Sequence, residues 1–272
     1  MKQAGATVFI LLFFCLFTTA QNFRLPASSP STRLYTYAGN GNAFSFAGNP
    51  SALAGIQQFS AGVYSEQRFM LKDIGHYNAT VAIPTQLGNF GFKGDYFGNS
   101  FFNESGIGIA YARKLGASVD VGVQFNYYGV NAGVYGSASA ITAEAGVIVH
   151  VTEQLRVGLH VYNPTSVKIG KGGGEDLPSM FDVGFGYDVS EVLFLSGTIE
   201  KVQNQPAAVT AAIQYNFDKK LFANAGIISS TGVYYLGFGV MHHDFLINAT
   251  ASLHPQLGFS PGLLLIYTKT KK

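Results

Sequence analysis

Three consecutive residues, His242, His243 and Asp244, are the densest group of side chains in the sequence that could bind a metal ion. Successive side chains of an extended strand point to opposite faces, so three neighbours on one strand do not converge on one ion. The group also falls at an expected turn between two strands. We therefore expect a solvated turn here and no metal site.

A wider set of ionisable and amide side chains occupies extended segments at positions that would share one face. A Ser-His-acid site could in principle be assembled from such a set, but we expect salt bridges and hydrogen bonds between neighbours. The sequence holds no Gly-x-Ser-x-Gly motif, and its Gly170–Gly174 run lacks the Lys-Ser/Thr ending of a phosphate loop. We therefore predict no enzyme activity and no cofactor. The residues expected on the shared polar face are Asp120, Gln124, Glu144, His150, Arg156, His160 and Asp182, with Glu200 as a further candidate.

The clearest of these segments is Ser118–Tyr127, in which small or polar residues alternate strictly with large apolar ones. Such alternation places the two kinds of residue on opposite faces of a β-strand. The pattern recurs at 182–188, 210–217 and 245–254, and segments of about 10 residues are long enough to cross a bilayer as tilted strands. The residues expected on the apolar face of Ser118–Tyr127 are Val119, Val121, Val123, Phe125 and Tyr127.

A soluble antiparallel sandwich and a transmembrane barrel share this alternation, so composition has to separate them. Only 12% of the residues are charged, about half the usual globular value. The chain also holds 33 Gly, 23 Phe and 15 Tyr residues but no Trp, so Phe and Tyr would have to form the aromatic girdles of a barrel. These features favour the barrel, and a net charge of +2 gives no argument for a nucleic-acid partner.

The first 20 residues have the layout of a cleaved secretory signal peptide: Lys2, an apolar run over Val8–Phe17 and small residues up to Ala20. The alternative is a single membrane helix, for which the run is shorter than the roughly 20 residues required. The mature chain would then lack Cys15 and contain no cysteine. We expect a periplasmic or plug segment over 21–55, a barrel over 56–268 and a basic tail over 269–272.

Fourteen strand candidates follow the plug segment, and an even number returns both termini to the same side of the membrane. Short inner turns should alternate with longer outer loops, of which Asn163–Asp176 is the longest. Ser229–Thr231 is an exception, because it is short for an outer loop. The expected strands are 56–65, 75–84, 89–98, 104–113, 117–128, 138–151, 154–162, 178–188, 191–201, 207–217, 220–229, 231–241, 244–253 and 257–268.

The stretch Ala43–Ala54 resembles the start of FadL-like outer-membrane fatty acid transporters, which have an Asn-Pro-Ala-Gly-Leu-Ala run before the first strand. Asn49, Pro50, Leu53 and Ala54 match that run, whereas the two residues between them differ. The resemblance implies a 14-stranded barrel with an N-terminal hatch. The carboxyl-terminal stretch His254–Pro261 is similar to the last hairpin of small Bacteroidetes barrels of the PorV/PorQ type, which are type IX secretion components.

Two functions follow from these resemblances. The first is a non-enzymatic accessory barrel that docks on a larger outer-membrane secretion machine, which the short chain and modest loops favour. The alternative is passive transport of hydrophobic small molecules such as fatty acids, and a general porin is weaker because the lumen lacks rings of charge. The expected location is the outer membrane, and the expected partners are its lipids, other outer-membrane secretion proteins or a hydrophobic ligand. We also expect Asn49 and Pro50 to pin the plug segment to the base of the barrel.

Overall fold

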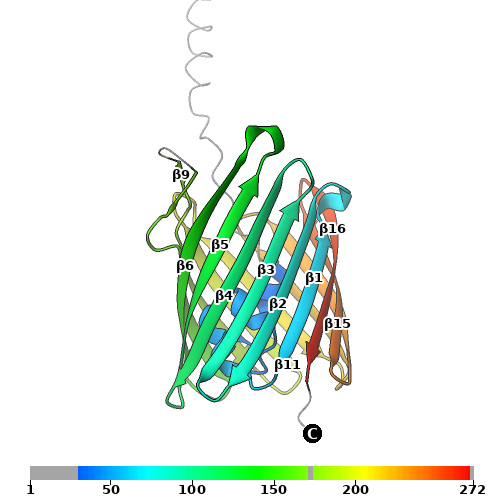
Figure 1. Cartoon of the computed structure of the whole chain (residues 1–272). Helices are drawn as coiled ribbons and strands as arrows, with labels where there is room; N and C mark the ends of the chain where they lie inside the picture. The colour runs from blue at the N-terminus through cyan, green and yellow to red at the C-terminus, as the bar shows by residue number, and fades with distance from the viewer. Residues whose placement is uncertain (1–29, 171–173, 270–272) are drawn as a thin grey trace, which may run out of the picture.

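A computed structural model describes residues 30–170 and 174–269, in which fourteen strands form one closed antiparallel barrel (Figure 1). Each strand pairs with its neighbours in the chain, and β1 pairs with β16 to close the barrel. The barrel strands are β1 (Ser60–Gln67), β2 (Gly75–Thr85), β3 (Gly88–Gly98), β4 (Asn103–Leu115), β5 (Val119–Asn131), β6 (Ser137–His150), β7 (Leu155–Tyr162), β10 (Met180–Asp188), β11 (Leu193–Val202), β12 (Ala208–Asn216), β13 (Leu221–Ile228), β14 (Val233–His242), β15 (Phe245–His254) and β16 (Gly258–Thr268).

The predicted fourteen-stranded barrel is confirmed, and most strand boundaries agree with the prediction to within three residues. The first strand begins at Ser60, four residues later than expected. Ile56 instead ends a 3-10 helix, and its side chain is buried in a cluster with Leu53. The predicted signal peptide (1–20) and most of the predicted basic tail (269–272) lie outside the described residues.

The faces of β5 show how the wall meets its surroundings. Val123, Phe125 and Tyr127 are 46%, 62% and 50% exposed, whereas the side chains of Gln124 and Asn126 between them are buried. The same alternation runs through the other strands, so the barrel carries a continuous outer belt of exposed apolar side chains. Such a belt is stable against lipid and not against water.

Aromatic pairs gather at the end of the barrel where β1 begins and β16 ends, called the inner end here. The Phe245 and Tyr267 rings are 5.3 Å apart, the Tyr215 and Phe217 rings 5.2 Å, and the Phe90 ring contacts Tyr111. Phe and Tyr thus take the girdle position at this rim, where amphipathic rings favour the membrane interface.

The connections follow the expected alternation. Turns at the inner end contain two to four residues, and loops at the outer end contain three to seven apart from 163–179. That long loop holds a two-stranded hairpin of β8 (Lys168–Ile169) and β9 (Glu175–Asp176), which alternation did not predict because its strands are only two residues long. Asn163 organises the loop: its backbone has a φ of +47° and its Nδ2 donates to Leu177 O at 2.7 Å.

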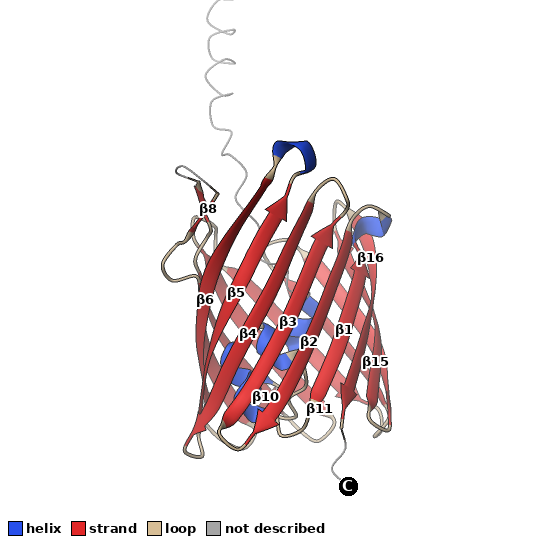
Figure 2. Cartoon of the chain, in the orientation of Figure 1, coloured by secondary structure: helices blue, strands red, loops and turns tan. Residues whose placement is uncertain are grey.

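Residues 30–56, called the inner segment here, lie inside the barrel (Figures 1 and 2). The segment consists of short helical turns, and the side chains of Phe44, Phe46 and Leu53 are fully buried. No helix among the described residues is both long and apolar enough to cross a membrane. The turns are α2 (Pro30–Arg33), η2 (Leu34–Tyr37), η3 (Ser45–Ala47) and η4 (Pro50–Gly55).

Candidate functional site

The inner segment approaches the wall where inward-facing residues are glycines. A Cβ atom on Gly122 would overlap the backbone of Pro50 and Ser51, and one on Gly146 would overlap the Asn49 amide. Glycine permits this close approach because it has no side chain. These small inward residues therefore make the space that the segment occupies. Three further glycines, Gly158, Gly184 and Gly186, accommodate Tyr37 in the same way.

Asn49 links the segment to the wall and also starts a helical turn. Its Nδ2 donates to Leu159 O at 3.1 Å, while its Oδ1 accepts from the backbone and hydroxyl of Ser51 at 3.0 and 2.6 Å. Asn at the N-cap followed by Pro50 at the first position is a favoured start for a helical turn. The link differs from the expectation in one respect: Leu159 lies in the middle of β7, so Asn49 contacts the wall rather than the base.

Two other side chains hold the segment by its backbone carbonyls. Arg156 Nε donates to Tyr37 O at 2.7 Å, and its Nη2 bonds to Asp188 Oδ2 at 2.6 Å. Asn89 Nδ2 lies 2.7 Å from two carbonyl oxygens near the end of the segment. Alternation placed Arg156 on the inner face, but the sequence reasoning missed Asn89, although it occupies the inward register of β3.

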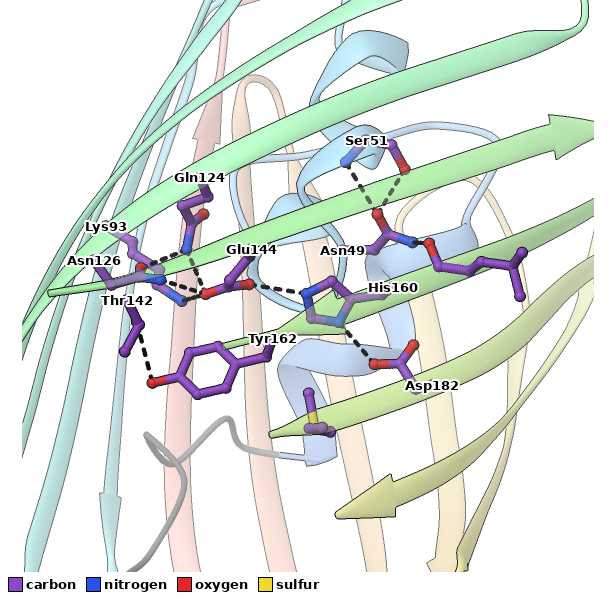
Figure 3. Close-up of polar contacts among 12 residues, drawn as sticks. Asn49, Ser51, Lys93, Gln124, Asn126, Thr142, Glu144, His160, Tyr162 and Asp182 are labelled. Carbon is purple, nitrogen blue, oxygen red and sulfur yellow. Dashed lines mark hydrogen bonds and ion pairs between the residues drawn. The ribbon is translucent and has the colours of Figure 1, made fainter. Parts of the chain in front are cut away.

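The charged and amide residues predicted on the inner face include a connected network centred on Glu144 (Figure 3). Its Oε1 accepts from Gln124 Nε2 at 2.9 Å and Asn126 Nδ2 at 2.6 Å, and lies 3.6 Å from Lys93 Nζ. Its Oε2 lies 2.9 Å from His160 Nε2. Lys93 is an addition to the predicted set, and its inward register on β3 was the available signal.

His160 joins this network to the inner segment. Its Nδ1 lies 2.7 Å from Asp182 Oδ2, and Tyr37 OH donates to the other oxygen of Asp182 at 3.5 Å. A histidine ring donates from both nitrogens only when it is protonated, and both nitrogens here face carboxylates. His160 is therefore an ion-pair partner and not free to act as the base of a Ser-His-acid site.

The remaining candidates are also paired near the rim or the segment. His150 Nε2 lies 2.8 Å from Asp120 Oδ2, and Glu200 forms an ion pair of 2.5 Å with Arg33 of the segment. The described residues include no group of three His, Cys, Asp or Glu side chains arranged for a metal ion. The His242 and His243 rings contact each other at 4.2 Å beside the last inner turn.

A different kind of cluster lies on the opposite side of the lumen. The side chains of Asn224, Asn248, Tyr35 and Tyr235 are buried, and their six polar atoms make no close hydrogen bond among the described residues apart from a contact between the Tyr35 hydroxyl and the Asn248 amide. Leaving a buried polar atom unpaired costs about 1–3 kcal/mol. We call these four residues the amide site. Sequence reasoning missed it, because nothing in the alternation distinguishes a paired amide from an unpaired one.

Two cavities flank the inner segment where residues 39–41 reach the inner end. One, of about 640 Å³, is lined by polar residues that include Asp120, His150 and Arg156. The other, of about 690 Å³, separates the segment from β14–β16 and is called the inner crevice here. Its lining combines apolar Phe245, Leu246 and Ile266 with polar groups such as Gln57 and Gln58 and with the charged Asp244 and Lys269.

Solved structures with the same architecture are bacterial hydrocarbon channels. The toluene transporter TbuX of Ralstonia pickettii matches with a TM-score of 0.65 and 12% identity, over 92% of this chain and 100% of that chain. The chain has the fold of these channels. The toluene transporter TodX of Pseudomonas putida matches with a TM-score of 0.63 and 10% identity, over 92% of this chain and 100% of that chain. A FadL homologue of Pseudomonas aeruginosa matches with a TM-score of 0.59 and 11% identity, over 91% of this chain and 98% of that chain. No protein-family model and no curated protein sequence matches the chain.

Proposed function

We propose that the chain is a passive outer-membrane channel for hydrophobic small molecules, closed at rest by the inner segment. The inner crevice carries this proposal, because its apolar side chains Phe245, Leu246 and Ile266 lie at the inner end of the lumen. Its volume of about 690 Å³ falls in the range of pockets that bind small molecules, roughly 300–1,000 Å³. The neighbours described as toluene transporters support the same class of cargo. This reading replaces the accessory role as the favoured function.

The way in which the segment is held suggests how the channel opens. Its hydrogen bonds and ion pair reach β1, β3, β7, β10 and β11 through Ser60, Asn89, Leu159, Asp182 and Glu200. Its described contacts with β12–β16 are mainly apolar packing of Leu34, Tyr35 and Phe44, with one polar contact between the Tyr35 hydroxyl and the Asn248 amide. Apolar packing is not directional, so separating this side breaks fewer hydrogen bonds than separating the other side. Cargo then passes between the segment and β12–β16 down its own gradient.

Uptake of 1-N-phenylnaphthylamine tests this proposal, because the probe fluoresces on entering a membrane and an intact lipopolysaccharide layer excludes it. Cells that express the chain should take up the probe several-fold faster than cells with an empty vector. Rates equal to the empty vector, with the assembled barrel present in the outer membrane, would refute the proposal.

A disulfide between residues 49 and 146 tests the role of the segment as the closing element. The Asn49 Cγ atom lies 2.8 Å from the position of a Cβ at residue 146, so two cysteines here are within reach of a disulfide bond. In a Cys15→Ser background, oxidised Asn49→Cys/Gly146→Cys should slow probe uptake and reduction should restore it. Each single cysteine variant is the control. Equal uptake in both redox states would show that the segment does not move during passage.

Docking on another outer-membrane protein remains the second candidate because of the outer loops. Phe101, Val134 and Tyr135 are 80%, 96% and 92% exposed at the tips of two adjacent loops. Large apolar side chains at such positions are typical of contact surfaces. Co-purification of a stoichiometric partner from detergent extracts, lost in Phe101→Ser/Tyr135→Ser, would support docking. The absence of an enzymatic activity and of a cofactor stays a prediction.

A further inference from the structure

The lumen is divided into a charged half and a neutral half. Over residues 208–268, the only Asp, Glu, Lys or Arg residues are Asp218, Lys219, Lys220 and Asp244, and all four lie in turns at the inner end. Strands β12–β16 therefore present no formal charge to the lumen apart from histidine. The inner segment adds only Arg33, which Glu200 pairs. Charged side chains meet this half only at its inner end, where Asp244 and Lys269 line the inner crevice.

The amide site lies in this neutral half, at the seam between the segment and the wall. The Asn224 and Asn248 Oδ1 atoms converge over Gly237, at 2.5 and 2.8 Å from the position that a Cβ there would occupy. Tyr35 comes from the segment, and its hydroxyl contacts the Asn248 amide. Tyr235 belongs to the adjoining cluster with Leu34 of the segment. The movable element and the fixed wall thus each supply polar groups.

Apolar residues lie between the inner crevice and this site. Leu246 and Ile266 line the crevice, and the same two residues pack in the cluster that contains Tyr35 and Phe44. A molecule that moves along this wall has its apolar body against Leu246, Ile266 and Leu264. Its other end then meets the amide site. The amides and phenols donate and accept hydrogen bonds without charge.

We propose that the amide site binds the uncharged hydrogen-bonding head group, a hydroxyl or a carbonyl, of an otherwise hydrophobic cargo molecule. The inference rests on the proposed channel function and specifies its cargo. A carboxylate is disfavoured, because moving it out of water without a cation or several directed donors is costly. A pure hydrocarbon gains nothing from the unpaired amides. The cargo is therefore a neutral amphiphile and not a fatty acid anion.

Three probes with one tolyl body separate these cargo classes at pH 7: 4-methylphenol (neutral head), toluene (no head) and 4-methylbenzoate (anionic head). Binding to the full barrel in detergent is measured by saturation-transfer NMR and calorimetry, with empty micelles as blank. One net neutral hydrogen bond predicts that 4-methylphenol binds about fivefold tighter than toluene. We expect 4-methylbenzoate to bind more weakly than both. Benzoate binding as tight as that of the phenol would overturn the inference.

The double variant Asn224→Leu/Asn248→Leu removes the amides but keeps the side-chain shape, so the barrel should fold. It should abolish the preference for 4-methylphenol over toluene while toluene still binds. Thr80→Val is the matched control, because it removes a buried unpaired hydroxyl on β2, outside the site. A preference unchanged in the double variant would overturn the inference. If none of the three probes binds but naphthylamine uptake persists, the inference about the amide site is refuted and the proposed channel function is retained. If uptake is also absent, the proposed channel function is refuted as well.

Discussion

Gly146→Ala should release the inner segment without changing any residue of the segment. The three atoms nearest to the new methyl group all belong to the Asn49 side chain, with Cγ at 2.8 Å and Nδ2 at 3.3 Å. The amide must therefore leave its place and lose its bonds to Leu159 O and to Ser51. Three hydrogen bonds at a net ~0.5–1.5 kcal/mol each give about 2–4 kcal/mol against the closed position.

Thiol labelling measures this loss. A single reporter cysteine, Ala52→Cys in a Cys15→Ser background, lies on the buried part of the segment. If labelling requires transient release of the segment, 2–4 kcal/mol corresponds to a labelling rate roughly 30- to 1,000-fold faster. Gly106→Ala is the control, because this glycine also faces inward but its new methyl would meet its nearest atom at an ordinary 3.5 Å.

A double-mutant cycle then isolates the cause. Asn49→Ala alone loses the same hydrogen bonds, so it should accelerate labelling to a similar extent. Asn49→Ala/Gly146→Ala should label no faster than Asn49→Ala, because the methyl group then has no amide to displace. Such non-additivity is the signature of two residues in direct contact. Additive effects, or a Gly146→Ala rate within twofold of wild type, would refute the steric reasoning.

Two further predictions address the wall and the second anchor. Val123→Arg places a cation on the lipid face, at a cost of about 2–4 kcal/mol at mid-bilayer, and should lower the yield of heat-modifiable barrel on gels. Val134→Arg is the control, because this residue lies on an exposed loop tip and the variant should assemble normally. Equal yields of the two variants would contradict a lipid-facing β5. Arg156→Leu removes the hydrogen bond to Tyr37 O, worth about 1.5–3 kcal/mol for a charged donor, and should raise naphthylamine uptake. Arg113→Leu is the control, because Arg113 is exposed. Unchanged uptake in Arg156→Leu would show that Arg156 does not hold the segment closed.

Alternation predicted the strands because lipid on one side forces a period of two on the wall. It assigned Gln124, Glu144 and His160 to the inner face, but it could not pair them. Pairing depends on register: Gln124 lies opposite Glu144, and Asp182 lies opposite His160. Single-strand patterns carry no information on register, so the network became visible only with the fold. The same limit concealed the amide site, whose members come from two strands, their neighbour and the segment.

A barrel of fourteen strands encloses more space than its own small inward side chains fill, so its interior must be occupied by something else. Here the chain itself supplies the filling, and glycines such as Gly122 and Gly146 leave room for it. A filling bonded equally to every strand would seal the lumen permanently. The inner segment is instead fixed by polar contacts to one side and packs against β12–β16 through apolar side chains. Because of this asymmetry, the inner crevice, the buried amides and the apolar contacts of the segment all lie beside β12–β16. A barrel of this fold would open between the segment and these strands.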